Sequence, residues 1–341
     1  MRENFAGPST IDQLHERASR PSEKVVEFLR DLRGDVMVIG AGGKMGFHLT
    51  NMLRRGLELA GQTSRLMAVS RFGSASATEL FERNNIETLS CDLIDPRQLS
   101  SLPDAENIFA LAGVKFGTAN DPSLLQQMNV DMPAGIAQRF SDARIVALST
   151  GCVYPFVSPQ SGGSKETDPV APVGEYALSC LGRERSYTNS SAKCVLIRLN
   201  YSVDLRYGVV VDIAQKVLHG QPIDVTMGYA NVIWQGDACE EIIMSLGLAS
   251  RPPCILNVTG SQILQIRKVA TRFAEIFDKP VTITGSESNT AWLNNASQAH
   301  RLFGSPAVDE DTLIQWVAHW LLSGGDILGK PTHFEVRDGK Y

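Results

Sequence analysis

Seven residues near the start of the chain read Gly40-Ala41-Gly42-Gly43-Lys44-Met45-Gly46. They follow a short apolar run, 35–39, that predicts a strand, and they lead into a segment, 44–60, that predicts a helix. Closely spaced glycines let backbone N–H groups approach a ligand, and a helix N-terminus carries partial positive charge. The segment therefore predicts the pyrophosphate-binding loop of a Rossmann-type dinucleotide site.

Strand and helix patterns alternate from residue 35 to about residue 200. Short apolar runs predict further strands at 65–70, 87–90, 107–111, 144–148 and 194–198. Such alternation indicates a parallel sheet that helices cover on both faces. Helical spacing then recurs at 209–219, 236–249, 263–278 and 309–323. The expected fold is α/β, a Rossmann-type doubly wound parallel sheet with a smaller, partly helical substrate lobe.

The same patterns predict the boundaries of these units. Residues 1–34 form an N-terminal helical extension, with one helix after Thr10 and a second from Pro21-Ser22-Glu23. The predicted units of the remaining chain are a Rossmann domain over 35–203 with a return at 231–260, a substrate lobe over 204–230 and 261–325, and a tail over 326–341. The extension is open to two interpretations, a lid or dimer contact and a helix pair packed on the core, of which the second is favoured.

Composition argues against several classes of partner. The 341 residues are 43% hydrophobic and carry a net charge of −5 without a basic stripe, so nucleic acid and anionic membranes are not expected. No apolar run reaches the roughly 18 residues of a membrane span, and the polar N-terminus lacks a secretory signal. The six cysteines and six histidines show no metal-ligand spacing. We therefore expect no metal, reduced thiols and a cytoplasmic location.

The end of the second predicted strand bears on cofactor choice. An acidic residue at this position usually binds the ribose hydroxyls of NAD, but this chain has Ser70-Arg71. A hydroxyl and a guanidinium suit a 2′-phosphate, so NADP is favoured and NAD is the alternative. Asp92 and Leu93, after the third strand, are expected to meet the adenine.

Further motifs follow the glycine loop in order: Cys91–Leu93, Ile108–Gly117, Asn129, Ser149–Tyr154, Glu175–Glu184, Asn231–Asp237 and Leu256–Gly260. With the G-x-x-G-x-x-G spacing of the loop, they resemble the extended short-chain dehydrogenase/reductase family, the NAD(P)-dependent epimerases and dehydratases that act mostly on nucleotide sugars. The resemblance covers about residues 35–320, and the second motif is similar to the UDP-galactose 4-epimerase branch. It implies cofactor contacts at Gly40, Gly42, Gly43, Lys44, Met45, Gly46, Ser70, Arg71, Asp92, Leu93, Leu111, Ala112, Gly113, Lys115 and Tyr176.

The resemblance also implies a catalytic set with one departure. Tyr176 falls on the residue that transfers a proton to or from the substrate oxygen, and Thr150 falls on its hydroxyl partner. The position of the family's catalytic lysine, one turn after the tyrosine, is Cys180. Three interpretations stay open: a site that binds cofactor without catalysis, a substitute cation from Arg183 or Lys115, or proton donation by a neutral tyrosine. Retained catalysis is favoured.

The second lobe departs from the family as well. Its members usually clamp a substrate pyrophosphate with arginines, but one such position is Ala230 and the segment 287–295 has no basic residue. A sugar or sugar acid without a nucleotide diphosphate is therefore expected. The residues predicted to contact it are Lys115, Thr150, Cys152, Asn200, Tyr201 and Trp234, with Arg206, Tyr207 and Asn231 as further candidates.

Two alternative functions remain open from the sequence. One is a noncatalytic NAD(P)-binding sensor or partner subunit, which the missing lysine favours. The other is a nucleotide-sugar epimerase or dehydratase. The family resemblance further implies a homodimer through helices near 123–140 and 176–189.

Overall fold

The computed structural model describes residues 7–115 and 122–339. The last two residues of the Ile108–Gly117 motif, and the ends of the predicted extension and tail, lie outside the described residues. Seven parallel strands form one sheet in the order β11-β6-β5-β4-β1-β2-β3. Their bounds are β1 (Val36–Ile39), β2 (Leu66–Ser70), β3 (Glu87–Ser90), β4 (Asn107–Ala110), β5 (Arg144–Thr150), β6 (Lys193–Leu199) and β11 (Cys254–Val258). The predicted Rossmann-type fold is confirmed, and β11 adds a strand that was not predicted.

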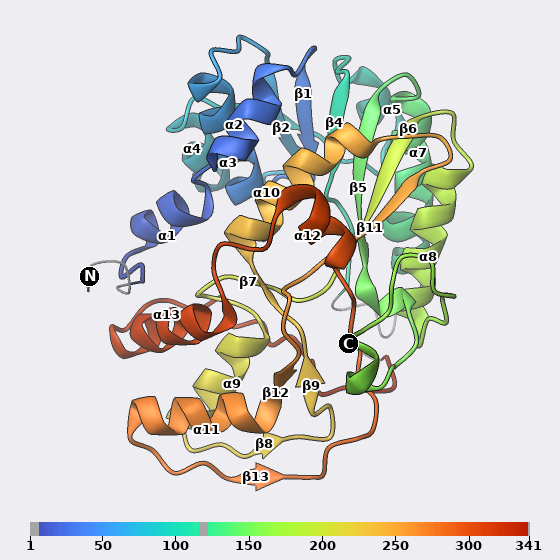
Figure 1. The fold of residues 1–341 in the computed structure, drawn as a ribbon. Coiled ribbons are helices and arrows are strands. Elements are labelled where there is room, and N and C mark those ends of the chain that lie inside the picture. The colour runs from blue at the N-terminus through green and yellow to red at the C-terminus, as the bar shows by residue number, and fades with distance from the viewer. Residues whose placement is uncertain (1–6, 116–121, 340–341) are drawn as a thin grey trace.

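Helices cover both faces of the sheet (Figure 1). Alternate residues of β1 show why: Val36 and Val38 pack on one face, Met37 and Ile39 on the other, because successive side chains of a strand point in opposite directions. The first face is covered by α2 (Glu23–Arg30), α3 (Gly46–Leu59) and α10 (Gln235–Ser245). The second is covered by α5 (Pro96–Ser101), α7 (Met132–Arg139) and α8 (Glu175–Thr188).

Shorter helical segments also lie in the connections between the strands. They include α4 (Ala75–Glu82), α6 (Pro122–Gln126) and the π-helical turn Gln127–Asp131, which leads directly into α7. Asn129 lies in this turn and is buried. Its amide binds both the N–H and the carbonyl of Val114, so the turn fixes the chain that follows β4.

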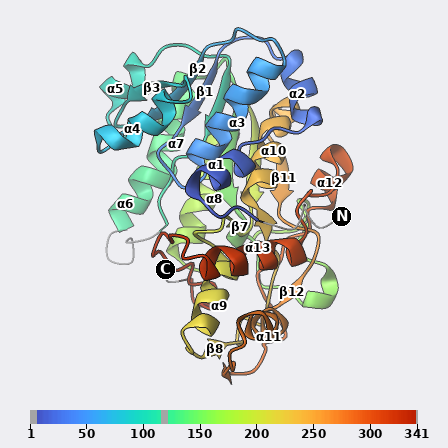
Figure 2. The ribbon, with the colours of Figure 1, turned by 90° about the vertical axis from the view of Figure 1, so that its left-hand side faces the viewer.

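A smaller lobe lies below the sheet (Figures 1 and 2). Its helices are α9 (Val209–Leu218), α11 (Ile266–Phe277) and α13 (Glu310–Leu322), and they share one hydrophobic core. Its strands form three two-stranded pairs: β7 (Ser202–Val203) with β10 (Ile233–Trp234), β8 (Ile223–Asp224) with β13 (Ile283–Thr284), and β9 (Tyr229–Ala230) with β12 (Leu264–Gln265). A further helix that was not predicted, α12 (Ser297–Phe303), packs Ala299 and Phe303 on the core of the sheet domain.

The N-terminal extension ties the two units together. Its first helix, α1 (Ile11–Ala18), begins after Thr10, whose hydroxyl accepts from the Gln13 N–H. Leu14 and Ala18 of this helix are buried in the core of the lobe. The buried side chains of α2 belong instead to the core beneath the sheet. The extension therefore packs on both cores.

The tail after α13 runs across the lobe as irregular chain with a few turns. Thr332 donates to the Asp212 carboxylate through its N–H, at 2.7 Å, and Lys216 pairs with Glu335 at 2.8 Å. At the far end, Gly339 packs against Gly174, the residue before α8. The tail thus connects the lobe with the helix that carries Tyr176.

Candidate active site

The predicted phosphate loop lies at the carboxyl end of β1, whose neighbours in the sheet are β2 and β4. Strands β1 and β4 lead to helices on opposite faces, so this is the position where open α/β sheets bind ligands. Gly40 has φ of +87°, and a Cβ there would meet the backbone N of Ala112 at 2.6 Å. A Cβ on Gly46 would lie 2.0 Å from the Ala41 carbonyl oxygen. The cradle therefore requires glycine, as expected for close approach to a diphosphate.

One cavity of about 240 Å³ opens on the outer side of this loop. It is lined by Gly40, Gly42, Gly43, Ser70, Arg71, Cys91, Asp92, Leu93, Ile94, Leu111, Ala112, Gly113, Met128 and Met132. The structure thus brings together the loop, the Ser70-Arg71 pair and the residues predicted to meet adenine. The donors and the apolar walls suit an adenosine, and the exposed Arg71 is placed at the rim.

A second cavity of about 400 Å³ lies on the other side of the loop, against the lobe. Its predicted members are Gly40, Gly43, Lys44, Met45, Gly46, Leu111, Gly113, Lys115, Thr150, Cys152, Tyr176, Asn200, Tyr201 and Tyr207. Val114, Ser149 and Gln235 also line it and lie within the motifs named above, and Arg183 was expected there only as a substitute cation. The lining residues that the sequence analysis did not predict are Leu148, Leu199, Ser202, Gly208 and Thr332. Thr332 comes from the tail, in which no motif predicts a site.

Thr150 and Tyr176 both face this second cavity. Thr150 is the last residue of β5, and its hydroxyl accepts from the Cys152 N–H at 3.2 Å. Tyr176 is the second residue of α8, whose position on the sheet is fixed by a buried ion pair between Glu184 and Arg198, with Nη2 to Oε2 at 2.8 Å. The Ser149 hydroxyl, next to Thr150, donates to the same Glu184 carboxylate at 2.6 Å. These contacts fix β5 and α8 relative to each other beside the cavity.

Burial sets the protonation of the tyrosine. It raises the pKa of the Tyr176 phenol well above its ordinary value, Cys180 and Cys152 add to this, and Arg183 opposes it. Cys180 is completely buried among Val153 and Tyr154. Burial also raises the pKa of the Cys180 thiol. At neutral pH both groups are therefore uncharged, and the thiol adds no negative charge beside the phenol.

Two cations bear on the charge of the tyrosine: Arg183, which lies two turns further along the same helix, and Lys115, which follows β4. The Arg183 guanidinium donates to the Leu148 carbonyl at 2.9 Å and to the Asn129 side chain, and it lies directly against Gly113. The Lys115 Nζ lies 5.7 Å from the centroid of the Tyr176 ring. Burial lowers the pKa of Lys115, while Cys152, Cys180 and Asp212 oppose this shift. Lys115, one of the two predicted substitute cations, thus lies near the Tyr176 ring.

Three predicted substrate contacts lie elsewhere. Trp234 is buried in the core of the lobe, edge-on to Trp316 with ring centroids 5.5 Å apart, so its prediction as a substrate contact is wrong. Local sequence could not separate a stacking platform from a core aromatic. Asn231 is buried and binds the backbone of Asn294, and Arg206 pairs with Asp204 at 2.8 Å. Asn200 does line the cavity, and its amide donates to Asn231 at 2.9 Å.

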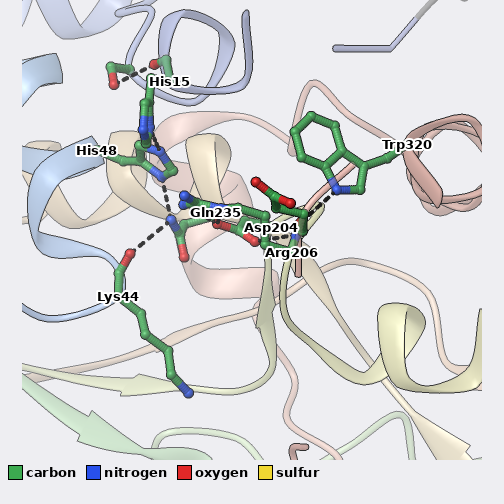
Figure 3. A network of polar contacts seen from close by, with 9 residues as sticks. His15, Lys44, His48, Asp204, Arg206, Gln235 and Trp320 are labelled. Carbon is green, nitrogen blue, oxygen red and sulfur yellow. Dashed lines mark hydrogen bonds and ion pairs between the residues drawn. The ribbon is translucent and has the colours of Figure 1, made fainter. Parts of the chain in front are cut away.

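A chain of polar contacts supports the phosphate loop from behind (Figure 3). His15 of α1 contacts His48 of α3, with Nδ1 to Nε2 at 2.8 Å. His48 in turn contacts the Gln235 amide at 2.5 Å, and Gln235 donates to the Lys44 carbonyl at 3.4 Å. Burial lowers the pKa of His15 to about 4 and that of His48 well below its ordinary value. The extension is thus linked to the loop through neutral imidazoles.

Two searches of the described residues bear on other functions. Within residues 7–115 and 122–339, no three His, Cys, Asp or Glu side chains gather in a way that could hold a metal ion. In the same part of the chain, no helix has the length and apolarity needed to cross a membrane. None of the six cysteines, all of which lie in this part of the chain, forms a disulfide bond.

Solved structures with the same fold include several that contain NAD. WbmG from Bordetella bronchiseptica in complex with NAD has 16% identity and a TM-score of 0.70, over 89% of this chain and 98% of its own. The UDP-glucuronic acid 4-epimerase from Bacillus cereus in complex with NAD has 16% identity and a TM-score of 0.67, over 84% and 98%. The UDP-glucose 4-epimerase of Thermus thermophilus, also with NAD, has 19% identity and a TM-score of 0.66, over 84% and 99%. At these identities the likeness establishes the fold.

Sequence comparison adds the family. No curated protein matches the chain significantly. Residues 36–201, which include the glycine loop, Thr150 and Tyr176, match the NAD dependent epimerase/dehydratase family. The residues of both cavities fit the dinucleotide that this family binds. This match confirms, over residues 36–201, the predicted resemblance to the NAD-dependent epimerases and dehydratases.

Proposed function

We propose that the protein is an NAD(P)-dependent oxidoreductase or epimerase that acts on a hydroxyl or carbonyl group of a carbohydrate lacking a nucleotide diphosphate. The observation that carries the proposal is the second cavity, where Thr150, Tyr176 and Lys115 converge beside the phosphate loop. These residues come from β5, from α8 and from the chain after β4. Such convergence of polar groups in one cleft is typical of an active site.

The side chains define a proton path to the substrate oxygen. The Tyr176 phenol is neutral at physiological pH, so its Oη acts as a proton donor when a carbonyl is reduced. The Thr150 hydroxyl hydrogen-bonds the same oxygen and orients it. The Lys115 ammonium and the Arg183 guanidinium stabilise negative charge that remains on the phenol after the transfer. When bound, the nicotinamide supplies or accepts the hydride.

The lobe supports a substrate without a diphosphate. Ala230, which falls on one of the family's arginine positions, is buried in β9. In the segment 287–295, Glu287 pairs with Arg267 at 2.6 Å, so the nearby guanidinium is engaged by a carboxylate. The tail also contacts this segment, since Arg337 donates to the Thr290 carbonyl at 2.7 Å. A monosaccharide-sized ligand suits the second cavity, with its volume of about 400 Å³.

We further propose NADP as the preferred cofactor. The support is Arg71 together with Ser70 at the rim of the first cavity, where a carboxylate would repel a 2′-phosphate. The solved neighbours named above hold NAD, which is the alternative.

A homodimer through α7 and α8 belongs to the same proposal. These helices line a groove of about 1060 Å³, and Leu178 in it is 48% exposed. A second copy would cover this apolar side chain. Light scattering should give a dimer mass that Leu178→Glu reduces to a monomer; a monomeric parent protein would contradict the assignment.

The decisive experiment combines a substrate panel with two variants. Purified protein is mixed with NADP, NADPH, NAD or NADH and with sugars, sugar acids, keto sugars and UDP-sugars. Cofactor fluorescence and the sugar products are both followed, because an epimerase returns its hydride and leaves no net change in cofactor. We expect turnover of a non-nucleotide member, and a loss of about tenfold or more in Lys115→Met, because an ammonium near the phenol is removed. The conservative variant Lys115→Arg keeps the charge and should retain more activity.

Each other outcome points to a different function. Turnover of UDP-sugars alone supports a nucleotide-sugar epimerase or dehydratase. Cofactor binding without turnover of any compound, in the parent protein and in Cys180→Lys alike, supports a noncatalytic sensor. Unchanged activity in Lys115→Met removes the lysine from the proposed mechanism.

A further inference from the structure

The polar contacts behind the phosphate loop have a defined order of donors and acceptors (Figure 3). The Lys44 carbonyl can only accept, so the Gln235 atom that meets it at 3.4 Å is the amide nitrogen Nε2. The second proton of this NH₂ group is available to His48 Nδ1, 2.5 Å away, which therefore accepts. A neutral imidazole that accepts at Nδ1 carries its proton on Nε2. His48 Nε2–H is thus the donor to His15 Nδ1, at 2.8 Å.

Burial maintains this order. The His48 and Gln235 side chains are only 1% and 3% exposed, and a buried polar group that loses its partner is destabilising. Because burial also lowers the pKa of both imidazoles, neither ring takes up a second proton at neutral pH. A second proton on His15 would turn its Nδ1 into a donor that faces the His48 N–H. The neutral rings therefore keep a continuous set of hydrogen bonds, here called the loop support, from His15 through His48 and Gln235 to the Lys44 carbonyl.

The far end of the loop support is anchored in the N-terminal extension. His15 lies on α1, next to Leu14, which is buried in the core of the lobe. The same helix is tied to α3, because Arg55 donates to the Glu16 carbonyl at 3.0 Å and pairs with the Glu16 carboxylate at 3.1 Å. The His15 ring also lies edge-on to Phe47, which directly follows the phosphate loop, with ring centroids 4.9 Å apart. The position of His15 is thus fixed by the lobe and by the helix that the loop begins.

The loop support acts on one peptide unit of the phosphate loop. The Lys44 carbonyl and the Met45 N–H belong to the same planar group, and in a trans peptide they point in opposite directions. A carbonyl held by Gln235 therefore fixes the direction of the Met45 N–H. Backbone N–H groups of such loops are donors to a diphosphate, and groups that are oriented before binding lose less entropy when the ligand arrives. Among the described residues that line the two cavities, His15 does not occur, so its effect on a ligand is indirect.

We propose that His15, His48 and Gln235 are positioning residues for the cofactor, and that the N-terminal extension orients the Lys44–Met45 peptide for the diphosphate through them. This inference rests on the proposed function, because it takes the glycine loop as the place where NADP or NAD binds. It gives the extension a part in cofactor binding. A helix pair that only packs on the two cores would stabilise the fold and leave the cofactor affinity of the folded protein unchanged.

Binding of cofactor fragments tests the proposal without requiring turnover. Titrations of the full chain compare ADP-ribose, which contains the diphosphate, with adenosine, which lacks it. His15→Leu removes the acceptor of the His48 N–H and should weaken ADP-ribose about fivefold, as for loss of one hydrogen bond. Gln235→Leu removes the donor to the Lys44 carbonyl itself and should weaken ADP-ribose about tenfold. Adenosine should bind both variants as it binds the parent protein.

Two matched variants separate positioning from stability. In His15→Asn the amide oxygen can replace Nδ1 as the acceptor, so the affinity for ADP-ribose should stay within about twofold of the parent value. Leu14→Ala opens a cavity in the lobe core beside His15 and should lower the melting temperature, but it should not change the affinity of the folded protein. If Leu14→Ala weakens ADP-ribose as much as His15→Leu, or if His15→Leu weakens adenosine equally, the extension is only structural and the proposal is overturned.

A second readout uses the protein without ligand. Amide exchange at residues 44–46 should be about threefold or more faster in His15→Leu than in the parent protein, and unchanged in Leu14→Ala, because the loop support no longer holds the peptide. Nitrogen NMR should show His48 protonated at Nε2. Equal exchange in parent and His15→Leu, or a proton on His48 Nδ1, contradicts the loop support.

The outcomes also separate this proposal from the proposed function. If ADP-ribose binding responds as expected but no sugar is turned over, the positioning role stands and only the proposed catalysis fails. If a sugar is turned over and His15→Leu leaves the affinity for ADP-ribose unchanged, the positioning role fails alone. A parent protein that binds no ADP-ribose, NADP or NAD overturns both.

Discussion

The two cavities beside the phosphate loop differ in the interactions that define them. In the first, Ser70, Arg71 and Asp92 surround a glycine cradle whose shape is fixed by backbone contacts. In the second, Thr150 and Tyr176 face the cavity, and a buried Cys180 stands where the resemblance places the family's lysine. Cofactor binding depends mainly on backbone geometry, whereas proton transfer depends on the charge near one phenol. The comparison shows how one chain can keep the first and rebuild the second.

The free energy needed to ionise the Tyr176 phenol measures what a neighbouring lysine would have to offset. A free phenol has a pKa near 10, so ionising it at neutral pH costs on the order of 4 kcal/mol. Burial of Tyr176 increases this cost, and Arg183 reduces it. Proton donation by the neutral phenol avoids the cost in the direction of reduction. In the proposed mechanism, reduction of a carbonyl is therefore favoured at neutral pH.

The largest expected effect is at the phenol. Tyr176→Phe keeps the ring but removes the proton donor, so kcat should fall by about 10² to 10⁴ while the dissociation constant of the cofactor stays unchanged. Stopped-flow reduction and fluorescence titration measure the two quantities. If activity survives this change, another residue transfers the proton, and the second cavity does not depend on the charge near this phenol.

The next effect is at the cradle. In Gly46→Ala the new methyl group would lie 2.0 Å from the Ala41 carbonyl oxygen, so the loop must shift. We expect loss of cofactor binding and a drop of about 1–3 kcal/mol in the free energy of unfolding, typical of overpacking. Gly73→Ala is the control, because a Cβ there meets nothing within 4 Å. Equal behaviour of the two variants would show that the cradle tolerates side chains.

A smaller effect is expected at the adenosine end. Arg71→Ala should weaken NADP about tenfold and leave NAD nearly unchanged, because a charged hydrogen bond reaches the 2′-phosphate alone. Competition titrations give both dissociation constants. If the parent protein prefers NAD, or if both cofactors weaken together, Arg71 does not select the cofactor.

The smallest effect concerns pH. Because the pKa of His15 is lowered to about 4 in the folded protein, the unfolded chain binds its proton first as pH falls. The free energy of unfolding should therefore decrease from about pH 6.5 down to pH 4, by less than about 1 kcal/mol per pH unit because the ring is partly exposed. Chemical denaturation at several pH values measures this slope. In His15→Asn the free energy of unfolding should fall less steeply with decreasing pH. An unchanged slope would show that His15 does not cause the pH dependence.

Local patterns carried much of the prediction. The glycine spacing, the apolar runs and the position of Tyr176 each depend on neighbours in sequence, and β1, α3 and α8 form where these patterns place them. The departure at Cys180 was visible in the same way. Trp234 was misjudged because a core aromatic and a sugar-stacking aromatic have the same local sequence.

The sequence by itself determined the Rossmann-type sheet, the glycine cradle and the absence of lysine one turn after Tyr176, since these are properties of short segments. Only the tertiary structure decided which charges meet around the phenol and the substrate. Lys44, Lys115 and Thr332 lie far apart in the chain and line one cavity because the sheet, the lobe and the tail pack together. Charge convergence depends on that packing, because Coulombic interactions act through space and no local pattern records them.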